Sequence, residues 1–129
     1  MQKELKCKDR VEKELESRVE DLKELWVDYC KGKDDNGLYE YGLGFDYVRD
    51  EDKEGYFRYQ LSWGGPSDEF RFFINPDFFC YRIEYWVMDW CDGACLVLTG
   101  NDKKLLMEIY SNFEGIGIVK QEFDKVSNG

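Results

Sequence analysis

The chain has 129 residues, of which 43% are hydrophobic and 17% aromatic, and its formal net charge is -10. This length indicates one domain with its own hydrophobic core, and no run reaches the roughly 18 consecutive apolar residues of a membrane-spanning helix. Histidine is absent, which excludes Ser-His-Asp and Cys-His nucleophile systems and any histidine general base.

Residues 3–31 are predicted to form one long helix. Their apolar residues recur every three or four positions, as on one face of a helix, namely Val11, Leu15, Val19, Leu22, Trp26 and Tyr29. Glu14 and Arg18 are spaced for an ion pair on the exposed side. Because the apolar stripe thins before Val11, residues 1–10 are expected to project, as a frayed end or as an arm for a partner or a second copy.

Four segments alternate apolar and polar residues with a period of two, which is typical of antiparallel strands with one buried face. They are residues 38–48, 56–63, 69–74 and 79–87. The apolar face is expected to carry Tyr39, Tyr41, Leu43, Phe45, Tyr47, Phe57, Tyr59, Leu61, Trp63, Phe70, Phe72, Ile74, Phe79, Tyr81, Ile83, Tyr85 and Val87. Turn-forming residues join the segments, so a four-stranded meander is the expected topology.

A second helix is predicted from about Asp102 to Phe113. Asn101 is suited to be its N-cap, and Gly115 follows as a stop. Its apolar face is predicted to consist of Leu105, Leu106, Ile109, Tyr110 and Phe113.

The expected fold is a single α+β domain over residues 1–129. It contains a long N-terminal helix, a four-stranded antiparallel meander and a C-terminal helix, with the helices packed on one sheet face. Residues 89–101 are expected to form a loop, and residues 120–129 a loose tail.

The five cysteines form no CxxC pair, and their odd number favours a reducing compartment over a disulfide framework. Cys91 and Cys95 are a single loose pair without histidine, so neither a metal nor another cofactor is expected. No spacing of carboxylates, Tyr or Lys points to catalysis, so we do not expect an enzyme. The charged N-terminus lacks the apolar region of a signal peptide, which favours a cytoplasmic protein.

The negative charge is unevenly distributed along the chain. Residues 1–33 hold nine basic and nine acidic residues, whereas residues 34–129 hold nine basic and nineteen acidic residues. A one-sided acidic surface repels nucleic acid and attracts basic protein surfaces. The alternative is that the acidic loops only keep an aromatic-rich domain soluble.

The candidate partner-binding residues are acids in predicted loops and tryptophans beside them. Tryptophan together with carboxylates suits a protein-binding hot spot that captures Lys or Arg. Alternatively, the indole rings cap the core. The candidates are Asp34, Asp35, Asp50, Glu51, Asp52, Glu54, Trp63, Asp68, Glu69, Asp89, Trp90 and Asp92.

Three stretches resemble a group of small acidic proteins encoded on bacterial plasmids, conjugative elements and prophages. They are residues 41–48 (YGLGFDYV), 56–72 and 81–94, and the most distinctive part is residues 58–72 (RYQLSWGGPSDEFRF). The resemblance covers about residues 20–115. It implies an anti-defence role, such as an anti-CRISPR or antirestriction inhibitor, and it implies no catalytic residues.

Two hypotheses follow. In the first, the chain is an inhibitor whose carboxylates mimic phosphate and block a basic nucleic-acid-binding surface of a CRISPR effector or another nuclease. It would not bind nucleic acid or membranes itself. In the second, the chain is a homo-oligomeric accessory or structural protein of a mobile element that associates through its N-terminal helix.

Overall fold

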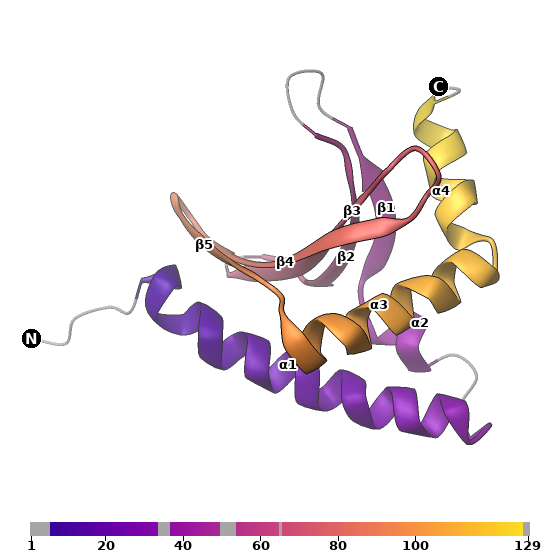
Figure 1. Cartoon of the computed structure of the whole chain (residues 1–129). Helices are drawn as coiled ribbons and strands as arrows, with labels where there is room; N and C mark the ends of the chain where they lie inside the picture. Colours follow the sequence, from indigo (N-terminus) through magenta and orange to yellow (C-terminus); the bar gives the residue numbers. More distant parts are fainter. Residues whose placement is uncertain (1–5, 34–36, 50–53, 65, 128–129) are drawn as a thin grey trace, which may run out of the picture.

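The computed structural model describes residues 6–33, 37–49, 54–64 and 66–127. The elements in chain order are α1 (Cys7–Cys30), α2 (Gly37–Tyr41), β1 (Gly44–Val48), β2 (Tyr56–Ser62), β3 (Ser67–Ile74), β4 (Cys80–Asp89), β5 (Asp92–Val97), α3 (Gly100–Gly115) and α4 (Ile118–Ser127). The strands form one antiparallel sheet in the order β1-β2-β3-β4-β5. Helices α1 and α3 lie beneath one face of this sheet, and no helix of the described residues covers the other (Figure 1). The α+β prediction is confirmed, with five strands instead of four.

The fifth strand replaces the loop predicted over residues 89–101. β5 pairs with β4 along its whole length, from Asp92 opposite Asp89 to Val97 opposite Glu84. The connection, Trp90-Cys91, lacks the Asn-Gly or Asp-Gly that marks a two-residue hairpin turn. The sequence therefore carried no strong signal for this hairpin.

The N-terminal part of the strand predicted over residues 38–48 is instead the short helix α2. Strand β1 begins only at Gly44. The sequence alternates Leu38, Tyr39, Glu40 and Tyr41, but four residues are too few to separate a period of two from a helical turn.

Helix α4 replaces most of the loose tail predicted over residues 120–129, and residues 128 and 129 lie outside the described part of the chain. It packs against β1, where the rings of Phe123 and Tyr47 lie 5.0 Å apart. Phe123 also contacts Phe78. Helix α3 runs from Gly100 to Gly115, slightly beyond the predicted ends, with Thr99 in the N-cap position in place of Asn101.

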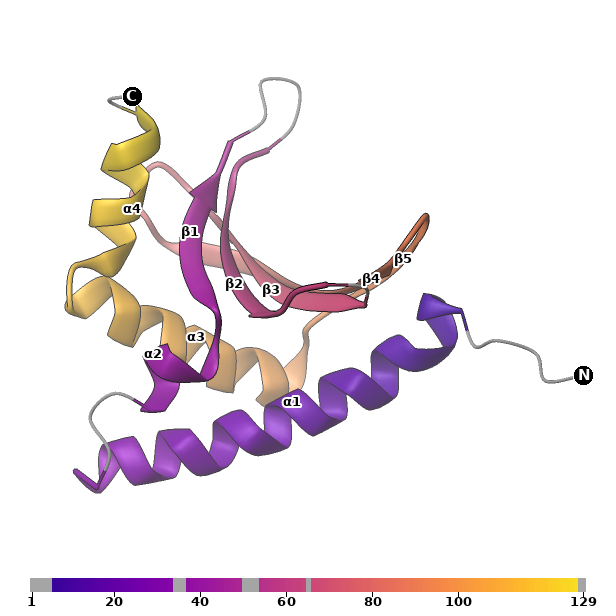
Figure 2. The same cartoon turned by 180° about the vertical axis from the view of Figure 1, so that it is seen from behind.

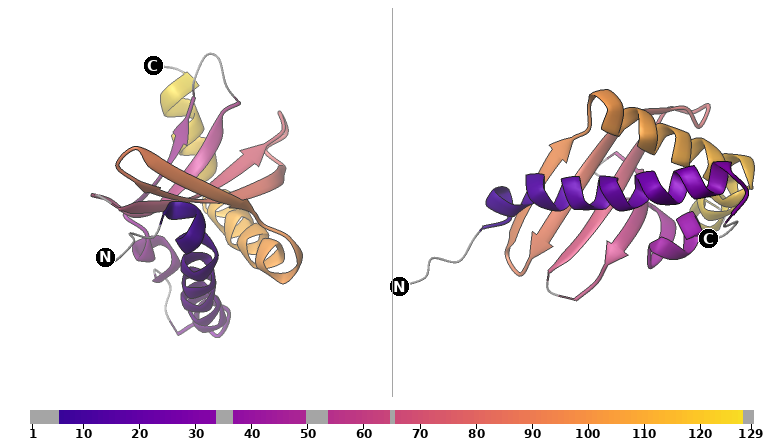
Figure 3. Two further views of the ribbon diagram at one scale, coloured as in Figure 1. Left: turned by 90° about the vertical axis from the view of Figure 1, so that its left-hand side faces the viewer. Right: turned by 90° about the horizontal axis from the view of Figure 1, so that it is seen from below.

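Helix α1 buries the predicted apolar stripe from Val11 to Leu22 and half-buries Trp26 and Tyr29, and its first turn is docked on the sheet. Cys7 is fully buried, and its backbone N–H donates to Asp92 Oδ2 over 2.7 Å. Residues 7–10 therefore do not project as predicted; residues 1–5 lie outside the described part of the chain. Seen from below, α1 crosses the strands next to α3 (Figure 3).

Two β-bulges change which side chains face the core. In β4, Cys80 pairs with Ile74 and Arg82 with Phe73, so Tyr81 is an extra residue. Because successive strand residues alternate faces, this bulge turns Cys80 inward. Phe79 is 62% exposed and Tyr81 is also exposed, which corrects their predicted place on the apolar face.

The second bulge lies in β2, where Gln60 pairs with Glu69 but Ser62 pairs with Asp68. Leu61 is the extra residue. Trp63, predicted to continue the buried face, instead lies beyond the strand and is 76% exposed. The core itself is aromatic, as expected, with closely packed rings of Phe45, Phe57, Tyr59, Phe72, Tyr110 and Phe113.

Candidate functional site

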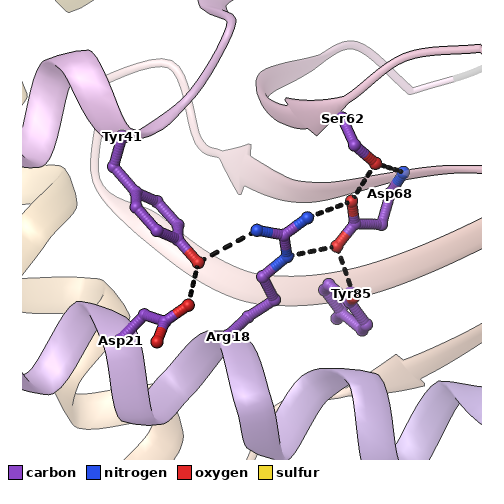
Figure 4. A network of polar contacts seen from close by, with 6 residues as sticks. All are labelled: Arg18, Asp21, Tyr41, Ser62, Asp68 and Tyr85. Carbon is purple, nitrogen blue, oxygen red and sulfur yellow. Dashed lines mark hydrogen bonds and ion pairs between the residues drawn. The ribbon is translucent and has the colours of Figure 1, made fainter.

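Asp68 is not a surface acid but the centre of a buried polar network between α1 and the sheet (Figure 4). Arg18 binds it with two hydrogen bonds, from Nε over 2.7 Å and from a terminal nitrogen over 2.9 Å. The hydroxyls of Ser62 and Tyr85 also donate to the carboxylate. A second terminal nitrogen of Arg18 donates to the Tyr41 hydroxyl over 3.0 Å.

The network stabilises the buried charges of Arg18 and Asp68 by giving both of them hydrogen-bond partners. Burial lowers the pKa of Arg18, but its hydrogen bonds to Asp68 and Tyr41 outweigh this effect and raise the pKa above the usual value. Burial, together with the hydrogen bond to Asp68, raises the pKa of Tyr85 well above its usual value. The predicted pair of Arg18 with Glu14 gives way to this interaction, because a buried carboxylate needs charged donors more than an exposed one does.

Glu69 is also buried, on the opposite face of the sheet. Its carboxylate accepts from Arg71 Nε over 2.7 Å. The Arg71 guanidinium in turn lies 4.7 Å from the ring centre of Tyr56 and 4.2 Å from that of Trp86. The charges at the centre of this polar face therefore pair with each other, and Glu69 is not available to a partner unless these contacts break.

Asp89 and Asp92 tie the β4–β5 hairpin to the start of α1. Asp89 forms an ion pair with Arg10 over 2.9 Å. Asp92 accepts from the Cys7 backbone N–H, and this hydrogen bond is the main reason why the pKa of Asp92 falls below its usual value. A carboxylate at the positive end of a helix is favourable, so Asp92 acts as a cap supplied from 85 residues away.

Among the described residues, Glu54 is the remaining candidate acid. Glu54 is exposed and accepts hydrogen bonds from the Tyr81 hydroxyl and from Arg82. The other acids of the candidate set lie outside the described residues, namely Asp34, Asp35, Asp50, Glu51 and Asp52.

The two candidate tryptophans are brought to the same end of the sheet. Trp63 directly follows β2 and Trp90 directly follows β4; because Ser67 pairs with Met88, the two turns are neighbours. Figure 2 shows both turns on the side where α1 begins. Trp63 is 76% and Trp90 93% exposed, so neither indole ring caps the core. We call these neighbouring turns the tryptophan end and define it by the described residues 63, 64, 66, 90 and 91.

Two further features mark the tryptophan end. Trp90 has a φ of 55°, a left-handed conformation that a residue with a large side chain rarely adopts. Leu43, which is exposed, donates its backbone N–H to Gln60 and so lies at the same end of the sheet. Several large apolar side chains are thus presented to solvent on tight turns.

An acidic groove lies between α1 on one side and β5 with the first turn of α3 on the other. Its volume is about 800 Å³. The carboxylates that line it are Glu12, Glu16, Glu20, Glu24 and Asp102, against the single cation Lys23. Leu15, Val19 and Leu98 are among its apolar lining residues.

The acidic groove escaped the sequence analysis because residues 1–33 are neutral when counted together. Two arginines of α1, Arg10 and Arg18, turn to carboxylates of the sheet. The glutamates on the groove side are left without ion pairs within the described residues. Their spacing of four residues, from Glu12 to Glu24, was the available signal, since such residues share one helix face.

Comparison with known proteins adds no assignment: no family model matches the chain, and no curated protein or solved structure is significantly similar to it. Across the described residues, no group of three or more Cys, Asp or Glu side chains is arranged to hold a metal ion. None of the helices in the described ranges has both the length and the apolar character needed to cross a membrane.

Proposed function

We propose that this chain is a protein-binding inhibitor and that the tryptophan end is its main contact with the target. The observation that carries the proposal is the 76% and 93% exposure of Trp63 and Trp90 on neighbouring turns. Tryptophan is the residue most enriched in binding hot spots, and burying an exposed indole at an interface recovers a large hydrophobic free energy. A strained backbone at Trp90 is consistent with a position kept for binding.

The charge of the chain supports a basic target. The net charge is -10, and the acidic groove adds a concentrated negative surface next to β5. Basic protein surfaces that are large enough to match such a field commonly bind nucleic acid. Together with the resemblance to mobile-element proteins, this supports a CRISPR effector or another nuclease as the target, blocked by mimicry of phosphate charge.

The test is inhibition of DNA cleavage by a panel of purified CRISPR effectors and restriction nucleases. The intact chain should inhibit a member of the panel, and W63A/W90A should weaken inhibition by about 100-fold, as expected for the loss of two hot-spot residues. F79A is the matched control, because Phe79 is also largely exposed but follows β3 at the opposite end of the sheet.

Salt provides a second readout. Raising the salt concentration to about 0.5 M should weaken inhibition, because it screens the interaction between surface charges. Inhibition that survives both W63A/W90A and high salt would contradict the proposal.

The alternative of a homo-oligomer joined through the N-terminal helix finds less support. The apolar stripe of α1 already packs on the sheet, and Val27 is the large apolar side chain that this helix leaves exposed within the described residues. Light scattering of the intact chain decides between the two, since a monomer mass excludes the oligomer.

A further inference from the structure

Strand β5 is an edge of the sheet, and half of its backbone is free to pair. The N–H of Leu98 donates to the C=O of Ile83, so in this antiparallel pair residues 94, 96 and 98 point their backbone groups toward β4. The intervening residues Cys95 and Val97 consequently point their N–H and C=O groups away from the sheet. Both residues are exposed.

The free edge of β5 opens into the acidic groove, because Val97 is one of the groove-lining residues. A chain segment placed against this edge would meet glutamates of α1 and Asp102 of α3. It would also meet the apolar side chain of Val97, which is 55% exposed; Leu15 and Val19 line the groove but are themselves buried in the core. The site thus offers backbone hydrogen bonds, negative charge and apolar surface together.

From this combination we infer that the edge of β5 receives an extended, lysine- or arginine-containing segment of the target protein as a sixth strand. Addition of a strand to a sheet edge uses backbone hydrogen bonds for affinity and alternate side chains for specificity. Five carboxylates against one ammonium group select basic side chains on the incoming strand. Beyond Asp92, which caps α1, β5 carries no charged side chain, and such an exposed edge is otherwise an aggregation hazard.

This inference deepens the proposed function, on which it rests, by naming the segment of the target that is bound. The hairpin connects the two surfaces, since β5 begins directly after the turn that carries Trp90. A segment paired along β5 would therefore run from the acidic groove to the tryptophan end.

The first experiment titrates the intact protein with a synthetic peptide of alternating lysine and valine. Binding should perturb the amide NMR signals of Cys95 and Val97 and slow their hydrogen exchange. The same peptide N-methylated at every residue has no backbone N–H to donate through either edge and should bind about tenfold more weakly. Failure of the lysine–valine peptide to bind, or equal binding of the N-methylated peptide, would overturn the inference.

Variants test the backbone edge and the charge separately. V97P removes an N–H that makes no bond to β4, and V97T keeps it; V97P alone should weaken peptide binding by about tenfold. E12Q/E16Q/E20Q/E24Q should weaken it by a similar factor, again about tenfold. Four exposed carboxylates outside the groove provide the matched control, E40Q/D77N/E108Q/E114Q, which should bind as the wild type does.

The outcomes separate this inference from the proposed function. Nuclease inhibition that depends on Trp63 and Trp90 but is unchanged in both V97P and the groove variant would refute the β5 site and leave the inhibitor proposal standing. Peptide binding with the expected variant effects, without inhibition of any nuclease in the panel, would support the β5 site and contradict the inhibitor proposal. Tighter binding of a helix-forming peptide of the same composition would also refute the extended segment.

Discussion

Replacing Asp68 by asparagine should destabilise the fold much more than replacing an equally well-bonded surface acid. Asp68 accepts two hydrogen bonds from Arg18, and the side chains are 7% and 23% exposed. Leaving one partner of a buried ion pair alone costs about 3–5 kcal/mol. Since Arg18 keeps some solvent and its bond to Tyr41, we expect about 3 kcal/mol.

Asp46 is the control, because Arg58 also binds it through two hydrogen bonds, of 3.0 and 2.7 Å, but these side chains are 44% and 30% exposed. D46N should cost about 0.5 kcal/mol. An unfolding entropy of roughly 2.1 cal/mol/K per residue gives about 0.27 kcal/mol/K for this chain, so Tm should fall by about 10 °C for D68N and about 2 °C for D46N.

Thermal and urea unfolding followed by circular dichroism measure both losses. A double-mutant cycle with R18M should give a coupling of about 2 kcal/mol, because the second substitution removes a charge that has already lost its partner. Equal losses in D68N and D46N would refute the view that burial, not hydrogen-bond geometry, gives this pair its importance.

Three further predictions concern the backbone and the thiols. W90G should be about 1 kcal/mol more stable than W90A in urea unfolding, because glycine accepts the left-handed φ at that turn without strain; equal stability would contradict this. G42A should lose about 2–3 kcal/mol, since a Cβ there meets the buried Tyr59 ring and lies 2.9 Å from the Gln60 carbonyl, whereas G44A, with open space around the Cβ, should be within about 0.5 kcal/mol of the wild type. At pH 8 a thiol reagent should modify the exposed Cys30, Cys91 and Cys95 quickly and the buried Cys7 and Cys80 only as the protein opens. Burial raises the pKa of Cys80 to about 11. The buried Cys80 thiol therefore contributes fully to stability below its unfolded pKa of about 8.5, and this contribution is lost as the pH rises through 11. Equal rates of modification of all five thiols would contradict the burial of Cys7 and Cys80.

The parts of the fold that follow a long, regular period could be predicted from the sequence. Val11, Leu15, Val19 and Leu22 recur at helical spacing, and all are buried in α1. The alternation in β2 likewise placed Phe57, Tyr59 and Leu61 in the core. Over such lengths a single period outweighs local exceptions.

The errors arose where one residue changes the register. The extra residue in β4 exposes Tyr81, and the pairing of Ser62 with Asp68 follows the extra residue in β2. A bulge depends on the neighbouring strand and on the side chains below it, so no local sequence pattern predicts it. Asp68 and Glu69 were predicted to be surface acids, but both are buried, Asp68 beneath Arg18 of α1 and Glu69 beside Arg71 on the opposite face.

The candidate site was predictable in its tryptophans but not in its charge. Trp63 and Trp90 were selected because they stand beside turns, and the register of β3 with β4 brings those turns together. The groove is acidic because Arg10 and Arg18 form ion pairs with acids of the sheet that lie far away in the chain, and so do not pair with the glutamates on the groove side of α1. Charge counted along a sequence does not reveal such a separation.

The dependence of α1 on partners far ahead of it in the chain has a consequence during synthesis. The ion pair of Arg18 forms only after Asp68 has been synthesised, 50 residues later. The hydrogen bond of Cys7 forms only after Asp92 has been synthesised, 85 residues later. Helix α1 packs mainly on β4 and β5, and about 67 residues separate the end of α1 from the end of β5, which corresponds to roughly 3–13 s of translation at about 5–20 residues per second. Until β4 and β5 have been made, the apolar face of α1 has no strand of its own chain to pack against, so we expect ribosome-associated chaperones to bind the nascent chain at this helix.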